Sequence, residues 1–275
     1  MKTEDIQAIR LIAVDLDGTL LTSESNMAPE GANLLNMATQ RGVHVILSTA
    51  RTIRSTRDLC NSLKTNSPVI CANGAQIFDS IRGDLWKSFT FPRDIGLEIA
   101  RLADSNGWGI NTLIGTTSYY RQSSGQTVGP IAPSRVVVAT NSDAVTGDLI
   151  RILVRDPEAI DPIIALCEAS YPDRCHLERY TAKDGTKSLG IMGNGIDKGK
   201  ALDLVLERLG IDEAEVMAIG DDLADLTLFS RARIKVAMGN ALPEVQKQAS
   251  AIAPGNDAEG VAWAIKKFSV LTELS

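Results

Sequence analysis

The chain has 275 residues, a formal net charge of −6 and a sequence pI of about 5.1. Its 44% hydrophobic and 23% charged residues are typical of a globular protein with room for one large domain or two ordinary ones. An acidic chain without a run of Lys and Arg repels polyanions, so we expect no nucleic-acid partner. We also expect no membrane partner, because no stretch reaches the roughly 18 apolar residues of a span. Four scattered cysteines and no apolar leader predict a cytoplasmic protein with reduced thiols.

The predicted elements begin with a buried strand over residues 10–16 that stops at an Asp-Gly-Thr turn. Helices over 29–42 and 53–63 then alternate with strands over 44–47 and 69–72. This alternation is typical of a Rossmann-like parallel α/β sheet. In such a sheet the loops at the carboxyl ends of the strands are available for chemistry.

The pattern changes beyond residue 79, where polar, Gly- and Ser-rich stretches appear, especially over residues 118–129. The elements predicted there are helices over 93–106 and 157–171 and strands over 110–114, 118–121, 149–154 and 176–181. The alternation returns with strands over 188–192, 216–219 and 234–237, and with helices over 198–209, after Asp222, and over 261–267. We therefore expect a core of residues 1–83 and 186–275, interrupted by an inserted α+β domain of residues 84–185.

Asp15 and Asp17 follow the first strand in the sequence D-L-D-G-T. Two carboxylates so close together repel each other and are costly to hold without a cation. Hard oxygen ligands at a strand end suit Mg²⁺, which also attracts phosphate oxygens. A carboxylate that attacks phosphorus forms an aspartyl phosphate, which splits one difficult step into two. The alternative is an Asp-Gly turn with solvated side chains, but the apolar strand before it favours a functional site.

Three further motifs follow strands or begin a helix: S-T-A-R at residues 48–51, D-K-G-K-A-L at 197–202 and G-D-D-L-A-D at 220–225. By itself S-T-A-R is an unremarkable strand end. In this order, however, the four motifs resemble those of the haloacid dehalogenase (HAD) superfamily. The resemblance implies that Asp15 is the nucleophile, that Asp17 is the general acid and base, that Thr49 hydrogen-bonds the transferring phosphoryl group, and that Lys198 offsets its charge.

The resemblance also implies the ligands of the Mg²⁺ cofactor. These are the carboxylates of Asp15 and Asp221 and the backbone carbonyl of Asp17. Asp222 and Asp225 are then expected to orient Lys198 or metal-bound water. Because HAD dehalogenases lack the second Asp of the first motif, the presence of Asp17 favours phosphoryl transfer.

The C-terminal sequences V-A-M-G-N-A (236–241) and N-D-A-E-G-V-A (256–262), together with N-G-A (73–75), resemble Cof-type (class IIB) HAD phosphatases. The insert then corresponds to their C2B-type cap, which covers the site and reads the substrate. Substrate or phosphate contacts are implied for Thr49, Ala50, Arg51, Asn73 and Lys198. The chain departs from the subfamily in two places, because Ala50 replaces a common Gly and Ala224 replaces an Asn that touches phosphate or substrate.

These features predict a Mg²⁺-dependent phosphomonoester hydrolase that acts on a small, sugar-phosphate-like metabolite through an aspartyl phosphate. A phosphomutase that uses the same intermediate is one alternative. A non-catalytic HAD scaffold that binds a phosphorylated ligand is another, although such a chain is expected to lack Asp15, Asp17 or Lys198. The motifs do not specify the ester or the oligomeric state.

Overall fold

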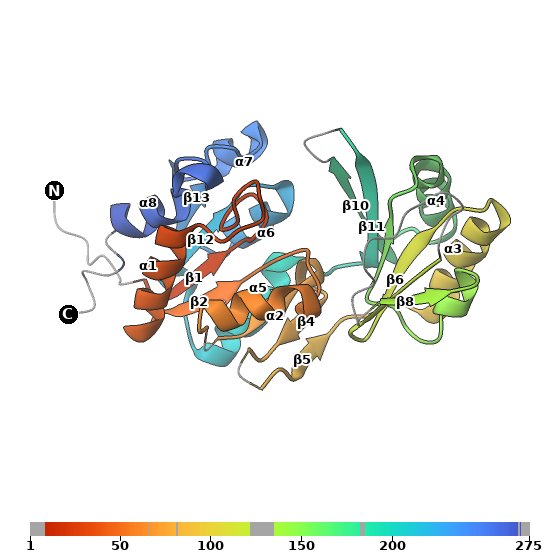
Figure 1. Cartoon of the computed structure of the whole chain (residues 1–275), viewed down its shortest axis with the longest axis horizontal. Coiled ribbons are helices and arrows are strands. Elements are labelled where there is room, and N and C mark those ends of the chain that lie inside the picture. Colours follow the sequence, from red (N-terminus) through yellow and green to blue (C-terminus); the bar gives the residue numbers. More distant parts are fainter. Residues whose placement is uncertain are drawn as a thin grey trace. The chain divides into compact units, whose positions relative to one another are not determined.

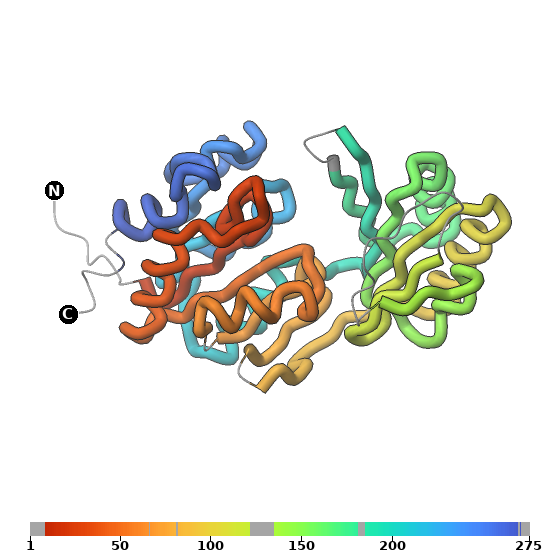
Figure 2. Tube along the Cα trace, in the orientation of Figure 1, coloured from red at the N-terminus to blue at the C-terminus, as the bar shows by residue number. Residues whose placement is uncertain are grey.

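The structure, a computed structural model, describes residues 9–65, 67–80, 82–121, 135–181, 185–268 and 270. The chain divides into two compact units, one formed by Met1–Lys87 with Asp197–Ser275 and the other by Ser88–Ile196. Figure 2 shows the N-terminal (red and orange) and C-terminal (blue) stretches of the trace within the first unit. None of the described helices is long and apolar enough to cross a membrane. That the inserted unit is a C2B-type cap stays a prediction.

The first unit is built on a parallel five-stranded sheet in the order β14-β13-β12-β1-β2 (Figure 1). Its strands are β1 (Leu11–Val14), β2 (His44–Leu47), β12 (Val216–Gly220), β13 (Ile234–Ala237) and β14 (Ala251–Ile252). Its helices are α1 (Pro29–Gln40), α2 (Ile53–Ser62), α5 (Lys198–Leu209), α6 (Leu226–Phe229), α7 (Pro243–Gln248) and α8 (Gly260–Lys267). The central strands β1 and β12 are fully buried, as expected for a parallel sheet covered on both faces, whereas the edge strand β14 exposes Ile252. The predicted α/β fold class is confirmed.

Strand β1 lies at the centre of this sheet, between β12 and β2. From β1 the chain runs first to β2 on one side, and it later returns to β12 on the other. This reversal of strand order opens a crevice at the carboxyl ends of the strands, which is where ligands bind in open α/β sheets. Asp15 follows β1 and Asp221 follows β12 at this edge, and Thr49 lies just beyond the end of β2.

The strand predicted over residues 69–72 is β3 (Val69–Cys71), and its pairing differs from the prediction. It forms an antiparallel sheet with β4 (Gln76–Phe78), which continues to β5 (Leu85–Ser88), and a parallel bridge joins Ile70 to Ser48, the residue after β2. The N-G-A sequence makes the turn between β3 and β4. Gly74 has a φ of +99°, and a Cβ there would lie 2.2 Å from the carbonyl oxygen of Asp197, so glycine is required.

The second unit contains a six-stranded sheet in the order β10-β11-β9-β6-β7-β8. Its strands are β6 (Ile110–Ile114), β7 (Thr117–Arg121), β8 (Arg135–Val138), β9 (Arg151–Val154), β10 (Cys175–Thr181) and β11 (Lys187–Gly193). Helices α3 (Arg93–Ser105) and α4 (Pro157–Ser170) pack on one face of the sheet and bury a separate apolar core. The unit is therefore an α+β domain with its own core.

The strand predicted over 188–192 does not belong to the α/β core. It is part of β11, which pairs antiparallel with β10 and β9 in the inserted unit. Its alternating pattern is compatible with either sheet, and only long-range pairing decides between them. Strand β8 and helix α7 were not predicted. Residues 122–129 of the polar stretch singled out in the sequence lie outside the described residues.

Candidate active site

Asp15 is held in place by the strand that precedes it. Its N–H donates to the carbonyl of Ile219 in β12 (3.0 Å), and its own carbonyl accepts from Leu20 (3.3 Å). The turn that follows requires glycine, because Gly18 has a φ of +83° and a Cβ there would lie 2.2 Å from Asp221 Oδ2. The D-L-D-G-T motif is thus a tight turn that packs directly against the acidic loop after β12.

A buried cation lies between two carboxylates at the centre of this site. Lys198 Nζ lies 2.6 Å from Asp15 Oδ1 and 2.7 Å from Asp225 Oδ1, and all three side chains are almost completely buried. Lys198 is the first residue of α5, whose N-terminus is capped by the Asp197 side chain through the N–H of Lys200 (2.8 Å). Although burial alone would lower the pKa of Lys198, the two carboxylates raise it, so the ammonium form is retained.

Asp225 has both carboxylate oxygens occupied. One accepts from Lys198, and the other accepts from the backbone N–H groups of Asp221 (3.0 Å) and Asp222 (3.1 Å). Asp225 therefore fixes Lys198 and the loop after β12 at the same time. The Asp222 side chain instead accepts from the N–H of Leu223 (2.6 Å) and caps the next turn. Of the two acids expected to orient Lys198, Asp225 is the one that contacts it.

Three carboxylates, those of Asp15, Asp221 and Asp225, each place one oxygen within 4.8 Å of the others. Thr19 donates its hydroxyl to Asp221 Oδ1 (2.8 Å) and orients that carboxylate. Burial raises the pKa of Asp15 well above its usual value, and neighbouring Asp225 and Asp221 add to this while Lys198 opposes it. Burial and the charge of Asp225 raise the pKa of Asp221 to about 7. The one ammonium group of Lys198 does not balance the charge of three carboxylates. The carboxylate oxygens of this cluster therefore suit a divalent cation.

The end of β2 brings Thr49, Arg51 and Asp17 together. The Thr49 side chain is buried, and its hydroxyl accepts from the Arg51 N–H (3.1 Å). The Arg51 guanidinium donates two hydrogen bonds to the Asp17 carboxylate, at 2.8 and 2.6 Å. Asp17 is half exposed, unlike Asp15, with 53% of its side-chain surface accessible. Asn73 is buried at the same edge, where its N–H donates to the carbonyl of Thr49 (3.0 Å).

The C-terminal segment supplies contacts to which the sequence analysis gave no role. The Asn240 side chain donates to the carbonyl of Gly18 (2.8 Å) and accepts from the N–H of Asn256 (2.9 Å). Asn256 in turn donates its side-chain amide to the carbonyl of Leu21 (2.8 Å). The two asparagines therefore brace the turn after Asp15. Their signals in the sequence are the A-M-G-N-A sequence after a predicted strand, which contains Asn240, and the N-D-A-E-G-V-A sequence, which begins with Asn256.

Two acids of the same segment hold the chain that runs on from this turn. Asp257 accepts from the N–H (2.8 Å) and the hydroxyl (2.7 Å) of Ser23. The Glu259 carboxylate accepts from the N–H groups of Glu30 (3.0 Å) and Gly31 (2.8 Å) in the first turn of α1. A carboxylate at a helix N-terminus is stabilising, because it pairs with unsatisfied N–H donors and the positive end of the helix dipole.

Asn240→Ala is expected to lower the free energy of unfolding by about 1 kcal/mol, because one amide side chain links two otherwise separate loops. The turnover rate should fall on the order of tenfold, because the turn that carries Asp15 and Asp17 is no longer held in place by the Asn240 side chain. Chemical denaturation and phosphate release measure the two effects. Asn33→Ala, which removes an exposed amide from α1, is the matched control. Wild-type turnover in Asn240→Ala would contradict the bracing role.

The model of the family described as haloacid dehalogenase-like hydrolase matches residues 12–265. The chain therefore belongs to the haloacid dehalogenase-like hydrolases. It is 28% identical to 5-amino-6-(5-phospho-D-ribitylamino)uracil phosphatase YcsE of Bacillus subtilis, over 98% of each chain. It is also 28% identical to phosphatase YwpJ of the same organism, over 94% of this chain and 99% of the relative. The predicted enzyme class, a HAD-type phosphatase, is confirmed.

Solved structures agree with this assignment. A haloacid dehalogenase-like hydrolase from Bacteroides thetaiotaomicron superposes with a TM-score of 0.81 at 25% identity, covering 94% of this chain and 99% of that one. The HAD subclass IIB sugar phosphatase BT4131 has the same fold, with a TM-score of 0.78 at 20% identity over 95% of this chain and 100% of that one. The resemblance to Cof-type, class IIB phosphatases is thus confirmed.

Proposed function

We propose that this phosphatase is a Mg²⁺-dependent phosphomonoester hydrolase that works through an aspartyl phosphate on Asp15. The observation that carries the proposal is the buried arrangement of Asp15, Lys198 and Asp225 beside Asp221. The arrangement holds a carboxylate nucleophile next to an ammonium group that offsets the charge of a phosphoryl group. It also retains enough negative charge to bind a divalent metal.

The proposed reaction uses these positions. A carboxylate oxygen of Asp15 attacks phosphorus. The bond between phosphorus and the leaving-group oxygen breaks as the leaving-group oxygen takes a proton from Asp17. Asp17 then takes a proton from water, whose oxygen attacks the phosphorus of the aspartyl phosphate. The bond between phosphorus and the Asp15 oxygen breaks, which releases inorganic phosphate and regenerates the Asp15 carboxylate. Lys198 and the Thr49 hydroxyl stabilise the charge on the phosphoryl oxygens. Asp15, Asp221 and the carbonyl of Asp17 would hold Mg²⁺, which would supply charge neutralisation and alignment of the phosphoryl group when bound.

Asp17 is engaged by Arg51 in this structure. Its role as acid and base therefore requires Arg51 to exchange at least one of these hydrogen bonds when the ester arrives. A guanidinium group that binds carboxylates through two parallel hydrogen bonds binds phosphate oxygens in the same way. We infer that Arg51 moves from Asp17 toward the phosphoryl group of the substrate. Asn73 and the Ala50 backbone border the same end of β2 and are proposed to line the phosphate site.

The substrate we propose is a small, sugar-like phosphate ester. Support comes from the names of the relatives, since YcsE is a phosphatase of a ribityl phosphate and BT4131 is a sugar phosphatase. A phosphomutase requires the same aspartyl phosphate and differs only in the acceptor hydroxyl. The non-catalytic alternative is disfavoured because Asp15, Asp17 and Lys198 are all present.

The test is the release of phosphate from a generic aryl phosphate with and without Mg²⁺, followed by a screen of sugar, nucleotide and cofactor phosphates. We expect Mg²⁺-dependent release, with the highest kcat/KM for a sugar-phosphate-like ester. Isomer formation without net phosphate release would identify a mutase instead. No release from any ester would contradict the proposal.

Mg²⁺ binding is expected to weaken by roughly tenfold between pH 8 and pH 6. The pKa of Asp221 is raised to about 7 by burial and by Asp225. The metal-free carboxyl group is therefore protonated below pH 7, and a metal ion must displace that proton. Calorimetry without substrate, in two buffers of different ionisation enthalpy, measures both the affinity and the proton release. Equal affinity at the two pH values, with no proton released, would contradict this assignment of Asp221.

A further inference from the structure

Three consecutive residues between β3 and β4 have a positive φ. The values are +50° for Ala72, +51° for Asn73 and +99° for Gly74. Alanine enters this left-handed region only at a cost, because its Cβ crowds the backbone there. A strained conformation of this kind persists only where its surroundings impose it, and such strain gathers at functional sites. We call residues 72–74 the left-handed turn.

One side of the left-handed turn holds the S-T-A-R loop that follows β2. The Asn73 N–H donates to the Thr49 carbonyl (3.0 Å), and the Ala72 N–H donates to the Arg51 carbonyl (2.9 Å). These two hydrogen bonds join residues that lie more than twenty positions apart in the chain. They fix the backbone of the loop on both sides of its central residue.

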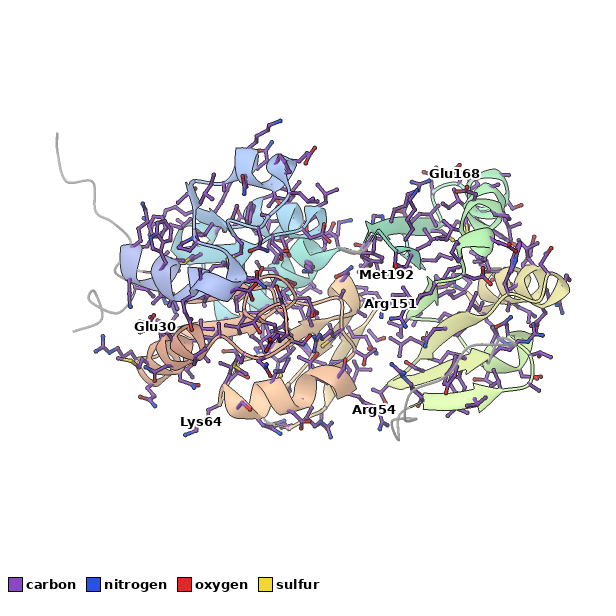
Figure 3. All side chains as sticks on the ribbon, turned by 45° about the horizontal axis from the view of Figure 1, so that its top comes forward. Glu30, Arg54, Lys64, Arg151, Glu168 and Met192 are labelled. Carbon is purple, nitrogen blue, oxygen red and sulfur yellow. The ribbon has the colours of Figure 1, made fainter. Side chains whose placement is uncertain are left out.

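The hydrogen bond to the Thr49 carbonyl also sets the direction of the next N–H group. No peptide bond of the described residues is cis, so the Thr49 carbonyl and the Ala50 N–H point in opposite directions. The Ala50 N–H is therefore directed away from the left-handed turn. Beyond the loop the chain enters α2, with Arg54 in its first turn and Lys64 just past its end (Figure 3). The left-handed turn thus acts on the chain at the point between β2 and α2.

The other side of the left-handed turn packs against the start of α5. A Cβ at Gly74 would lie 2.2 Å from the carbonyl oxygen of Asp197 and 3.0 Å from the backbone nitrogen of Lys198. The Gly74 backbone therefore contacts the peptide that joins these two residues, where α5 begins. Because Lys198 Nζ lies 2.6 Å from Asp15 Oδ1, a displacement of this peptide would move the ammonium group relative to Asp15.

We propose that the left-handed turn is a positioning element of the active site. Its backbone sets the spacing between the loop that carries Thr49 and the start of the helix that carries Lys198. These are the two side chains that stabilise the phosphoryl charge in the proposed function, on which this inference rests. Phosphoryl transfer depends on the exact placement of such groups, so a small shift of either one is costly. The turn acts through Thr49 and Lys198, and its strain is retained because both neighbours impose its conformation.

The first experiment compares Gly74→Ala with the matched variant Gly42→Ala. Gly42 has a φ of +86°, but a Cβ there would meet no other described atom within 4 Å. Both variants therefore place alanine in the left-handed region, and only Gly74→Ala displaces the start of α5. The probe is orthovanadate, which adopts the five-coordinate geometry that phosphorus has during transfer.

The dissociation constant of orthovanadate in the presence of Mg²⁺ is measured by calorimetry. We expect the Kd to rise about tenfold or more in Gly74→Ala and to keep its wild-type value in Gly42→Ala. Partial unfolding lowers the stoichiometry of binding and leaves the affinity of the folded molecules unchanged. A purely structural role of Gly74 would therefore not raise the Kd.

The second experiment uses the wild-type chain, so it does not depend on the folding of a variant. Coupling between two sites is reciprocal, and a ligand that the turn helps to position must also stabilise the turn. Saturating orthovanadate and Mg²⁺ should slow hydrogen exchange of the Ala72 and Asn73 N–H groups at least about tenfold more than that of Val43. The Val43 N–H is the control, because it donates to the Ala38 carbonyl (3.0 Å) before the opposite end of β2.

An unchanged Kd in folded Gly74→Ala, or equal slowing of exchange at Ala72, Asn73 and Val43, would overturn the inference and leave the proposed function intact. Phosphate release by a wild type that does not bind orthovanadate would do the same. A wild type that neither binds orthovanadate nor releases phosphate from an aryl phosphate would reject the proposed function, and the inference with it.

Discussion

Asp15→Asn is expected to reduce phosphate release by roughly 10⁴-fold or more while the protein stays folded. The amide is a poor nucleophile and forms no acyl phosphate, so the route through a covalent intermediate is closed. Its folding cost is small, because the change removes one of three crowded carboxylates and leaves Lys198 paired with Asp225. Steady-state kinetics and thermal unfolding in the absence of metal measure the two effects.

The control for Asp15→Asn is Asp203→Asn. Asp203 is a partly exposed acid of α5 that pairs with Arg231 outside the site, so its loss should leave turnover near the wild-type value. Quenched reactions supply a second readout, since a phosphorylated protein should accumulate transiently in the wild type and be absent in Asp15→Asn. Retention of wild-type turnover in Asp15→Asn would remove Asp15 from the mechanism.

Lys198→Met is expected to destabilise the first unit by about 3–5 kcal/mol at pH 8, in addition to abolishing turnover. Its ammonium group is the partner of two buried carboxylates, and its removal leaves the charges of Asp15 and Asp225 together without compensation. We expect a fall in Tm of roughly 10 °C, measured by calorimetry. Buried carboxylates without a cation take up protons as the pH is lowered. The loss of stability in Lys198→Met should therefore be smaller at lower pH.

Two further variants separate the loss of charge from the loss of packing. The double variant Lys198→Met with Asp225→Asn removes one of the uncompensated charges and should recover part of the lost stability. Lys266→Met removes an exposed lysine that pairs with Glu30, and it should change stability by about 0.5 kcal/mol at most. Equal effects of the Lys198 and Lys266 substitutions would contradict the role of Lys198 as the buried counter-charge of the site.

The acids at strand ends could be predicted because local sequence carries the signal. A short apolar run that stops at Asp-x-Asp-Gly identifies a buried strand with carboxylates at its end. Parallel strands then bring their carboxyl ends to one edge of a sheet. The structure accordingly places Asp15, Lys198 and Asp221 in one cluster, although they are far apart in the chain. The enzyme class followed from the same motifs.

The partners of these side chains could not be predicted, since they depend on geometry after folding. The sequence predicts the same role for Asp222 and Asp225. Only Asp225 contacts Lys198, because the turn after β12 directs the Asp225 side chain inward. Nothing in S-T-A-R indicates that Arg51 binds Asp17. Asn240 was part of a recognised signature, but its contact with Gly18 spans 222 positions of the chain.

The sequence by itself thus determined the fold class, the family and the residues that gather at the candidate catalytic edge, because each depends on local patterns and on their order along the chain. Tertiary structure decided which sheet takes β11, how β3 pairs and which acid holds Lys198. The physical reason is that strand pairing and side-chain contacts between distant segments are selected by packing and long-range hydrogen bonds. An alternating strand pattern is satisfied equally well by either sheet.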